Sequence, residues 1–140
     1  PFIIDKFPSL KQSNEIYKGG VYTRPLLKEL FDNNITFLGD AAHPIVPFLG
    51  QGACLALEDA YAFGHLIKKH NNDFEKAQKE YENIRLNRIR LIHKKSLNQA
   101  KLNHLNNPIL VFLRNVFMKY TRIILIRMND IWSYRISKKL

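Results

Sequence analysis

The fold of this chain is decided by residues 35–60, which read ITFLGDAAHPIVPFLGQGACLALEDA. The first four residues are apolar and partly β-branched, a composition that predicts a short buried strand. Gly39 and Asp40 end this strand with a residue that can turn sharply and a carboxylate at the C-terminal edge. Pro44 and Pro47 restrict the backbone that follows and exclude a continuous helix there. The pattern therefore predicts a strand, a stiffened loop and then a helix.

This helix is expected to run from Ala53 to about His70, with two asparagines, at 71 and 72, as its stop. Three-to-four spacing places six residues near one face of it: Cys54, Leu57, Ala60, Tyr61, Gly64 and His65. The unpaired N–H groups and the positive dipole end of a helix that follows a glycine-bearing loop favour anions. The residues thus predict either an anion-binding helix start or a strand–loop–helix unit without a ligand.

This stretch resembles the second flavin-binding motif of the FAD-dependent aromatic hydroxylases, the single-component flavoprotein monooxygenases of the salicylate-hydroxylase type. The resemblance rests on the Asp-Ala-Ala-His block at 40–43, on two prolines at 44 and 47, and on three glycines at 39, 50 and 52. It implies an α/β fold, in which this chain is the C-terminal part of a Rossmann-like FAD-binding domain and is itself mostly α with a few short strands. The first motif of the family, Gly-x-Gly-x-x-Gly, is absent from the sequence.

The resemblance also implies which residues contact the cofactor. Gly39 and Asp40 would hold the ribityl chain, with the carboxylate hydrogen-bonded to its hydroxyls. Pro47 would line the oxygen-reacting side of the ring. The negative pyrimidine edge of the reduced ring would be stabilised by backbone N–H groups of Gly50, Gln51, Gly52 and Ala53. No side chain of the segment is expected to act as an acid, base or nucleophile, so we predict no catalytic residue.

For the complete protein, the resemblance implies a monooxygenase that hydroxylates an aromatic or similar small substrate with FAD, NAD(P)H and dioxygen. One alternative is an inactive or split-gene fragment that keeps only the flavin-ring half of the FAD site. Another is a peripheral membrane module built on the basic C-terminal region. Residues 45–48 are similar to kynurenine-type hydroxylases and residues 52–54 to salicylate-type ones. The substrate, the choice between NADH and NADPH, and the oligomeric state therefore stay open.

Beyond the motif, residues 73–103 predict one long helix that begins at an aspartate cap and carries Glu75 and Lys79 as an i,i+4 pair. Two further amphipathic helices, joined near residues 120–121, are predicted over 109–136. Upstream, 1–14 is expected to be loop, 16–23 a strand interrupted at its glycines, and 26–31 a short helical turn. These elements predict a division into the end of a substrate-binding region (1–24), the FAD motif (25–72) and a helical region (73–140).

Several polar residues allow both a structural and a functional interpretation. Arg85 and Arg88, in a Tyr-Glu-x-x-Arg-x-x-Arg sequence that extends the resemblance, are expected to form structural ion pairs, although they could orient a carboxylate. His43 is expected to support the loop rather than act as a base. Glu58 and Asp59 point in different directions on a helix, and one of them is expected to be buried in a hydrogen-bond network.

The composition narrows the function classes. Residues 1–60 carry 5 Lys+Arg against 7 Asp+Glu, and residues 61–140 carry 17 against 5, so the net charge of +10 arises in the C-terminal region. That region has no nucleic-acid motif, and basic residues interrupt its apolar stretch, which predicts no spanning helix. Contact with a membrane surface is less expected than packing on the FAD domain.

The histidines have no metal-ligand spacing, so no metal site is predicted. One cysteine, Cys54, interpreted as a small packing residue, and no visible signal peptide fit a cytoplasmic protein.

Overall fold

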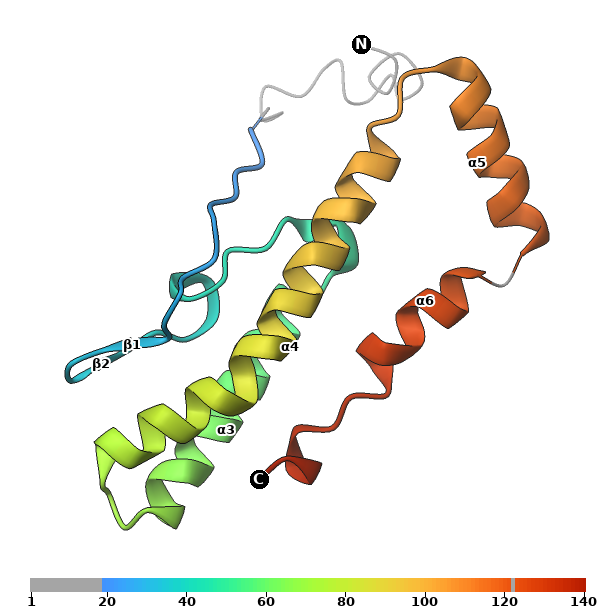
Figure 1. Ribbon diagram of the computed structural model, residues 1–140. Coiled ribbons are helices and arrows are strands. Elements are labelled where there is room, and N and C mark those ends of the chain that lie inside the picture. Colours follow the sequence, from blue (N-terminus) through green and yellow to red (C-terminus); the bar gives the residue numbers. More distant parts are fainter. Residues whose placement is uncertain (1–18, 122) are drawn as a thin grey trace, which may run out of the picture.

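The structure is a computed structural model that describes residues 19–121 and 123–140. Within these ranges the chain is mostly helical, as predicted, with two short strands (Figure 1). The α-helices are α3 (Gly52–Lys69), α4 (Phe74–Asn103), α5 (Pro108–Tyr120) and α6 (Ile123–Trp132). The strands are β1 (Phe31–Asp32) and β2 (Ile35–Thr36), and three short 3-10 helices are η1 (Gly39–Ala41), η2 (Pro47–Leu49) and η3 (Ile136–Lys138). The described part of the chain contains no parallel sheet of the Rossmann type.

Strands β1 and β2 form an antiparallel hairpin, in which Phe31 pairs with Thr36 and Asp32 with Ile35. The predicted buried strand over 35–38 is therefore wrong in length and in burial, because Ile35 is 60% exposed. A lone two-stranded hairpin has no layer over its outer face, which leaves such a side chain in solvent. The helical turn predicted over 26–31 is also wrong, since Phe31 belongs to a strand. Residues 19–23 contain no strand, and residues 1–18 lie outside the described ranges.

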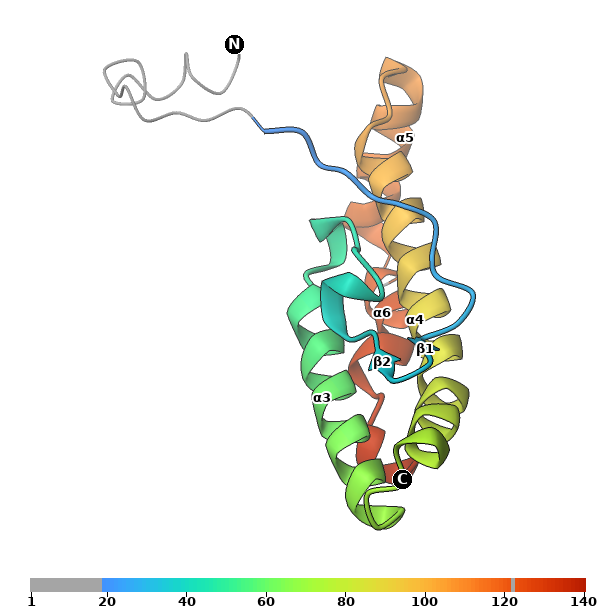
Figure 2. The same cartoon turned by 90° about the vertical axis from the view of Figure 1, so that its left-hand side faces the viewer.

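The centre of the molecule is the antiparallel pair of α3 and α4, which lie side by side (Figures 1 and 2). The turn between them uses the predicted asparagines, since Asn71 and Asn72 have φ of 50° and 67°. Left-handed backbone of this kind ends a helix, and Asn is one of the few non-glycine residues that tolerate it. Asp73 then begins α4 by accepting a hydrogen bond from the backbone N–H of Lys76, as predicted for a cap. The Glu75–Lys79 pair is confirmed at 2.6 Å.

The core lies mainly between α3 and α4. It consists of two buried clusters, one of Leu30, Ala42, Ala62, Leu66, Ala77, Tyr81 and Ile89, and one of Leu55, Ile92 and Ile131. The buried stripe of α3 is therefore Leu55, Asp59, Ala62 and Leu66. The six residues predicted to share a face of this helix are instead exposed, Leu57 to 72%. Cys54 is one of these six, so its interpretation as a packing residue is wrong.

The two predicted C-terminal helices are confirmed as α5 and α6. Helix α5 lies beyond the end of α4 that is remote from the α3–α4 turn (Figures 1 and 2), and none of its residues is buried. It is joined to α4 by Arg114, whose Nη1 donates to the carbonyl oxygen of Leu102 at 2.9 Å. In the described residues, no helix combines the length and the apolar character needed to cross a membrane.

Candidate functional site

The segment that follows β2 presents an exposed carboxylate beside a buried glycine. Gly39 is buried and has φ of +55°, and a Cβ added there would lie 3.3 Å from the Cβ of Ala56. Both the left-handed backbone and the close approach to α3 therefore require glycine there. Asp40 lies next, in the first turn of η1, and its side chain is exposed. The chain thus holds its backbone against α3 and directs a carboxylate to the surface.

The loop from Pro44 to Gly50 leads into an open helix start. Pro47 begins η2, and Gly50 ends it with φ of +62°, a conformation that glycine adopts without strain. Helix α3 begins at Gly52, one residue before the predicted start, and its N-cap Gln51 has no side-chain cap hydrogen bond within the described structure. The first N–H groups of α3 are therefore available to an anion, at the positive end of an 18-residue helix.

The buried side of α3 carries Asp59, which joins three separate parts of the chain. Its Oδ2 accepts hydrogen bonds from the backbone N–H of Gly39 at 3.0 Å and from Nε2 of His43 at 2.5 Å. Its Oδ1 accepts from Nε of Arg85 in α4 at 2.8 Å. All three side chains are fully buried. The expected burial of one carboxylate of the Glu58–Asp59 pair is confirmed, and the partners include two residues of the flavin-like motif.

These contacts decide the charge of Asp59. Burial alone raises the pKa of its carboxyl, but the hydrogen bonds from His43 and Gly39 and the positive charge of Arg85 outweigh that effect. The pKa of Asp59 is therefore held below its ordinary value, so the carboxylate is ionised at neutral pH. For Arg85, burial alone lowers the pKa, and the negative charges of Asp59 and Glu58 raise it overall. The pair is thus ionic and satisfied on both sides.

A second layer of charge surrounds this pair. Glu58 accepts from Nη1 of Arg85 at 2.7 Å and from Nη2 of Arg88 at 3.1 Å. Arg88 also donates to the backbone carbonyl oxygens of Asp130 and Ile131, at 3.0 and 3.1 Å. The expected structural ion pairs of both arginines are confirmed. Because α6 supplies those two carbonyls, the network connects α6 to α3 and α4.

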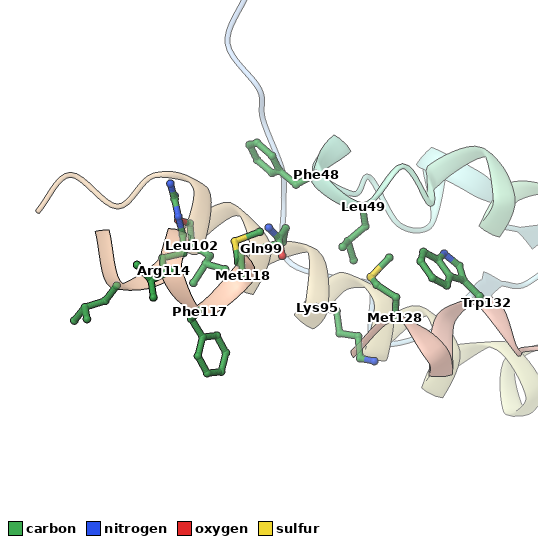
Figure 3. A pocket seen from close by; sticks show the side chains of 12 residues that line it. Phe48, Leu49, Lys95, Gln99, Leu102, Arg114, Phe117, Met118, Met128 and Trp132 are labelled. Atoms are coloured by element: carbon green, nitrogen blue, oxygen red, sulfur yellow. The ribbon is translucent and has the colours of Figure 1, made fainter. Parts of the chain in front are cut away.

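An apolar cavity lies next to the loop. Its volume is about 750 Å³, within the range of small-molecule sites. Its wall is formed by Phe48, Leu49, Lys95, Gln99, Leu102, Leu113, Arg114, Val116, Phe117, Met118, Met128 and Trp132. Figure 3 shows Leu49 of η2 and Met128 of α6 pointing toward one another from opposite sides. Since Phe48 and Leu49 directly follow Pro47, the cavity adjoins the residue that was predicted to line the ring.

The structure brings η1, which contains Gly39 and Asp40, and residues 50–53 to the N-terminal half of α3, whereas Pro47 lies in η2, which packs on α4. Gly50, Gln51, Gly52 and Ala53 form the helix start, and Gly39 packs against Ala56 one turn later. The link from Asp59 to the loop was not anticipated. The sequence contains a signal for this link, because Asp59 has the same helical spacing as the buried residues Leu55, Ala62 and Leu66. A carboxylate buried among apolar side chains needs a hydrogen-bonding or charged partner. Within the described residues, no group of three or more His, Cys, Asp or Glu is arranged to hold a metal ion.

The sequence of the chain is similar to parts of several known enzymes. No family model matches the chain. Over 70 residues, half of its length, the chain is 40% identical to a 3-hydroxybenzoate 6-hydroxylase of Polaromonas naphthalenivorans. It is 42% identical over 71 residues to a 3-amino-4-hydroxybenzoate 2-monooxygenase of Streptomyces platensis, which is 51% of this chain. A kynurenine 3-monooxygenase of Sus scrofa is 34% identical over 88 residues, or 61% of this chain.

The resemblance to the FAD-dependent aromatic hydroxylases is therefore confirmed for about half of the chain, which corresponds to the C-terminal part of these relatives. The matched stretches span only about a fifth of the relatives, 18% of the first two and 19% of the third. The named relatives are hydroxylases and monooxygenases, that is, oxidoreductases.

Proposed function

We propose that this chain is the C-terminal part of a FAD-dependent monooxygenase that hydroxylates a small aromatic substrate with NAD(P)H and dioxygen. The observation that carries the proposal is the joint placement of an exposed Asp40 and the uncapped start of α3, on one motif and held by one buried network. A surface carboxylate can accept hydrogen bonds from the hydroxyl groups of the flavin side chain. The N–H groups of a helix start can donate to the negatively charged edge of the ring.

The residues present fit the flavin-ring half of FAD. A Cβ added at Gly50 or Gly52 would meet no described residue beyond its immediate chain neighbours within 4 Å, so this stretch offers open space to a planar group. In the described structure, Nδ1 of the buried His43 has no hydrogen-bond partner, which leaves one polar atom of the loop available to a group or a water molecule. When bound and reduced, FAD supplies the electrons that activate dioxygen.

The roles of the chain itself then follow from chemistry at named atoms. The Asp40 carboxylate binds hydroxyl groups of the ribityl chain, and the N–H groups of Gly52 and Ala53 stabilise negative charge on the ring edge. Pro47 shapes the side of the ring on which oxygen reacts. The apolar cavity beside it excludes water and accommodates an aromatic ring, in keeping with the substrates in the names of the relatives.

The experiment that tests this function is substrate-stimulated NAD(P)H oxidation by the complete protein, measured with oxygen uptake and product analysis. The panel contains 3-hydroxybenzoate, 3-amino-4-hydroxybenzoate and kynurenine, after the substrates that name the relatives. We expect one or more of these to increase oxidation and to yield a product with one added oxygen atom. A FAD-containing protein whose NAD(P)H oxidation responds to none of them and yields no hydroxylated product would speak against the hydroxylase assignment.

A further inference from the structure

Asp59 makes two contacts with the flavin-like loop that no ordinary structural ion pair requires. One contact is to the backbone N–H of Gly39 and the other to Nε2 of His43, and both use the same oxygen, Oδ2. These two residues bracket Asp40, one residue before it and three residues after it. A single carboxylate oxygen therefore fixes the short arc of chain from which the proposed ribityl ligand projects.

The N-terminal end of the same helix is the proposed anion site. Gly52 and Asp59 are seven residues apart in α3, which is close to two helical turns, or roughly 10 Å along the axis. A helix segment of this length is stiff. The hydrogen bonds that Gly39 and His43 make to Asp59 therefore also hold Asp40 at a fixed position relative to the N–H groups of Gly52 and Ala53. The distance between two cofactor contacts is thereby set by one buried side chain.

The remaining oxygen of Asp59 is held from the opposite side. Oδ1 accepts from Nε of Arg85, whose Nη1 is itself held by Glu58 at 2.7 Å. With donors on both of its oxygens, the carboxylate cannot rotate without losing a hydrogen bond in a fully buried place. Its position is therefore determined by α4 as well as by α3.

We propose that Asp59 is a positioning residue of the flavin site, which sets Asp40 in register with the start of α3. This inference rests on the proposed function, because it assumes that Asp40 and the helix start bind one cofactor. Asp59 does not touch the cofactor in this scheme. It acts through Gly39 and His43, so its effect is on cofactor affinity and not on an acid–base step.

The informative substitution is Asp59→Asn. An ionised carboxylate is acceptor-only, whereas an amide presents one acceptor and one NH2 donor group. With the N–H of Gly39 on one side and Nε of Arg85 on the other, the amide must turn its donor toward one of these donors. We expect it to keep Arg85 and release the backbone N–H of Gly39, because the hydrogen bond to a charged group is the stronger one. The shape of the side chain stays the same.

The control is Glu58→Gln, which changes the neighbouring carboxylate of the same ion network. Glu58 contacts Arg85 and Arg88 but has no hydrogen bond to the loop among the described contacts. Both variants remove one negative charge from the network, so both are expected to lower the melting temperature. Only Asp59→Asn is expected to lower the affinity of the complete protein for FAD, by about ten- to a hundredfold, the loss that corresponds to one hydrogen bond to a charged group.

A second measurement needs no cofactor. In this 140-residue chain, amide hydrogen exchange of Gly39 reports directly on its hydrogen bond to Asp59. We expect the Gly39 amide to be protected in the native chain and in Glu58→Gln, and to exchange faster in Asp59→Asn. If Asp59→Asn does not fold, His43→Leu removes one of the two loop contacts, and we expect a smaller loss of FAD affinity from it.

Three outcomes separate the possibilities. Faster exchange at Gly39 with a selective loss of FAD affinity in Asp59→Asn supports the inference. An unchanged FAD affinity in folded Asp59→Asn or His43→Leu overturns it, as does an equal loss in Glu58→Gln. A native complete protein that binds no FAD, with Gly39 still protected through Asp59, refutes the proposed function and, with it, the cofactor role assigned to Asp59.

Discussion

The guanidinium carbon of Arg88 lies 4.1 Å from the ring centroid of Tyr134, which places an aromatic ring from the C-terminal segment directly over the ion network of α3 and α4. Tyr134 also accepts a long hydrogen bond from Nη1 of Arg85, at 3.4 Å. The segment after α6 therefore covers the buried charges. Exclusion of water strengthens the ion pairs beneath it, because the local dielectric constant is lower there.

Replacing Tyr134 by Ala is expected to lower the free energy of unfolding by about 1–2 kcal/mol, since it removes a cation–π contact with a largely desolvated arginine. Tyr134→Phe keeps the ring and loses only the long hydrogen bond, so its stability is expected to stay near the native value. Urea unfolding followed by circular dichroism measures both. Equal losses in the two variants would show that the hydroxyl, and not the ring, carries the contact.

Replacing Arg88 by Met is expected to be more harmful, by about 3–5 kcal/mol, because it leaves Glu58 with an unpaired oxygen and frees the carbonyls of Asp130 and Ile131. Since those carbonyls belong to the end of α6, limited proteolysis should cut the variant first after this helix. A variant as stable as the native chain would contradict the assignment of Arg88 as the link to the C-terminal region.

Gly39 and Gly64 offer a matched pair of glycine substitutions. Gly39→Ala forces a left-handed residue and a 3.3 Å contact with Ala56, so we expect a loss of about 1–3 kcal/mol. Gly64→Ala, in the exposed interior of α3 with nothing within 4 Å, is expected to gain roughly 0.5–1 kcal/mol. Thermal unfolding of both variants in parallel tests the geometry, and a stabilised Gly39→Ala variant would contradict it.

The lowered pKa of Asp59 predicts a defined pH dependence. A carboxyl whose folded pKa lies below its unfolded value binds fewer protons in the folded state, so it stabilises the fold at higher pH. Relative to Asp59→Asn, the native chain is expected to hold a constant advantage above about pH 5 and to lose it as the pH falls below 3.8, the ordinary value of the group. Urea unfolding from pH 7 to 2.5 measures the difference. A difference in the free energy of unfolding that grows in favour of the native chain on acidification would contradict the lowered pKa of Asp59.

Much of the helical structure was predictable because its signals are local. Proline and glycine spacing set the start of α3, paired asparagines set its end, and an aspartate cap set the start of α4. The strand over 35–38 was overestimated since an apolar run gives no information about what covers it. The same reason explains the exposed face of α3: spacing shows which residues share a face, whereas burial depends on a neighbour distant in sequence.

The candidate site was predictable only in part. The motif located Asp40 and the helix start, but the contacts among Gly39, His43 and Asp59 join positions 16 and 20 residues apart in sequence. The cavity depends on residues from η2, α4, α5 and α6, which no local pattern brings together.

The most direct test of the account is the FAD content and FAD affinity of the complete protein, compared with those of Asp40→Ala and of Asp32→Ala as a control from the hairpin. Both carboxylates are exposed, so neither substitution is expected to alter folding. The account predicts bound FAD in the native protein and in Asp32→Ala, and a sharp loss of it in Asp40→Ala, measured by absorbance after purification and by titration of the apoprotein. Equal FAD content and affinity in all three proteins would contradict the placement of the flavin at this motif.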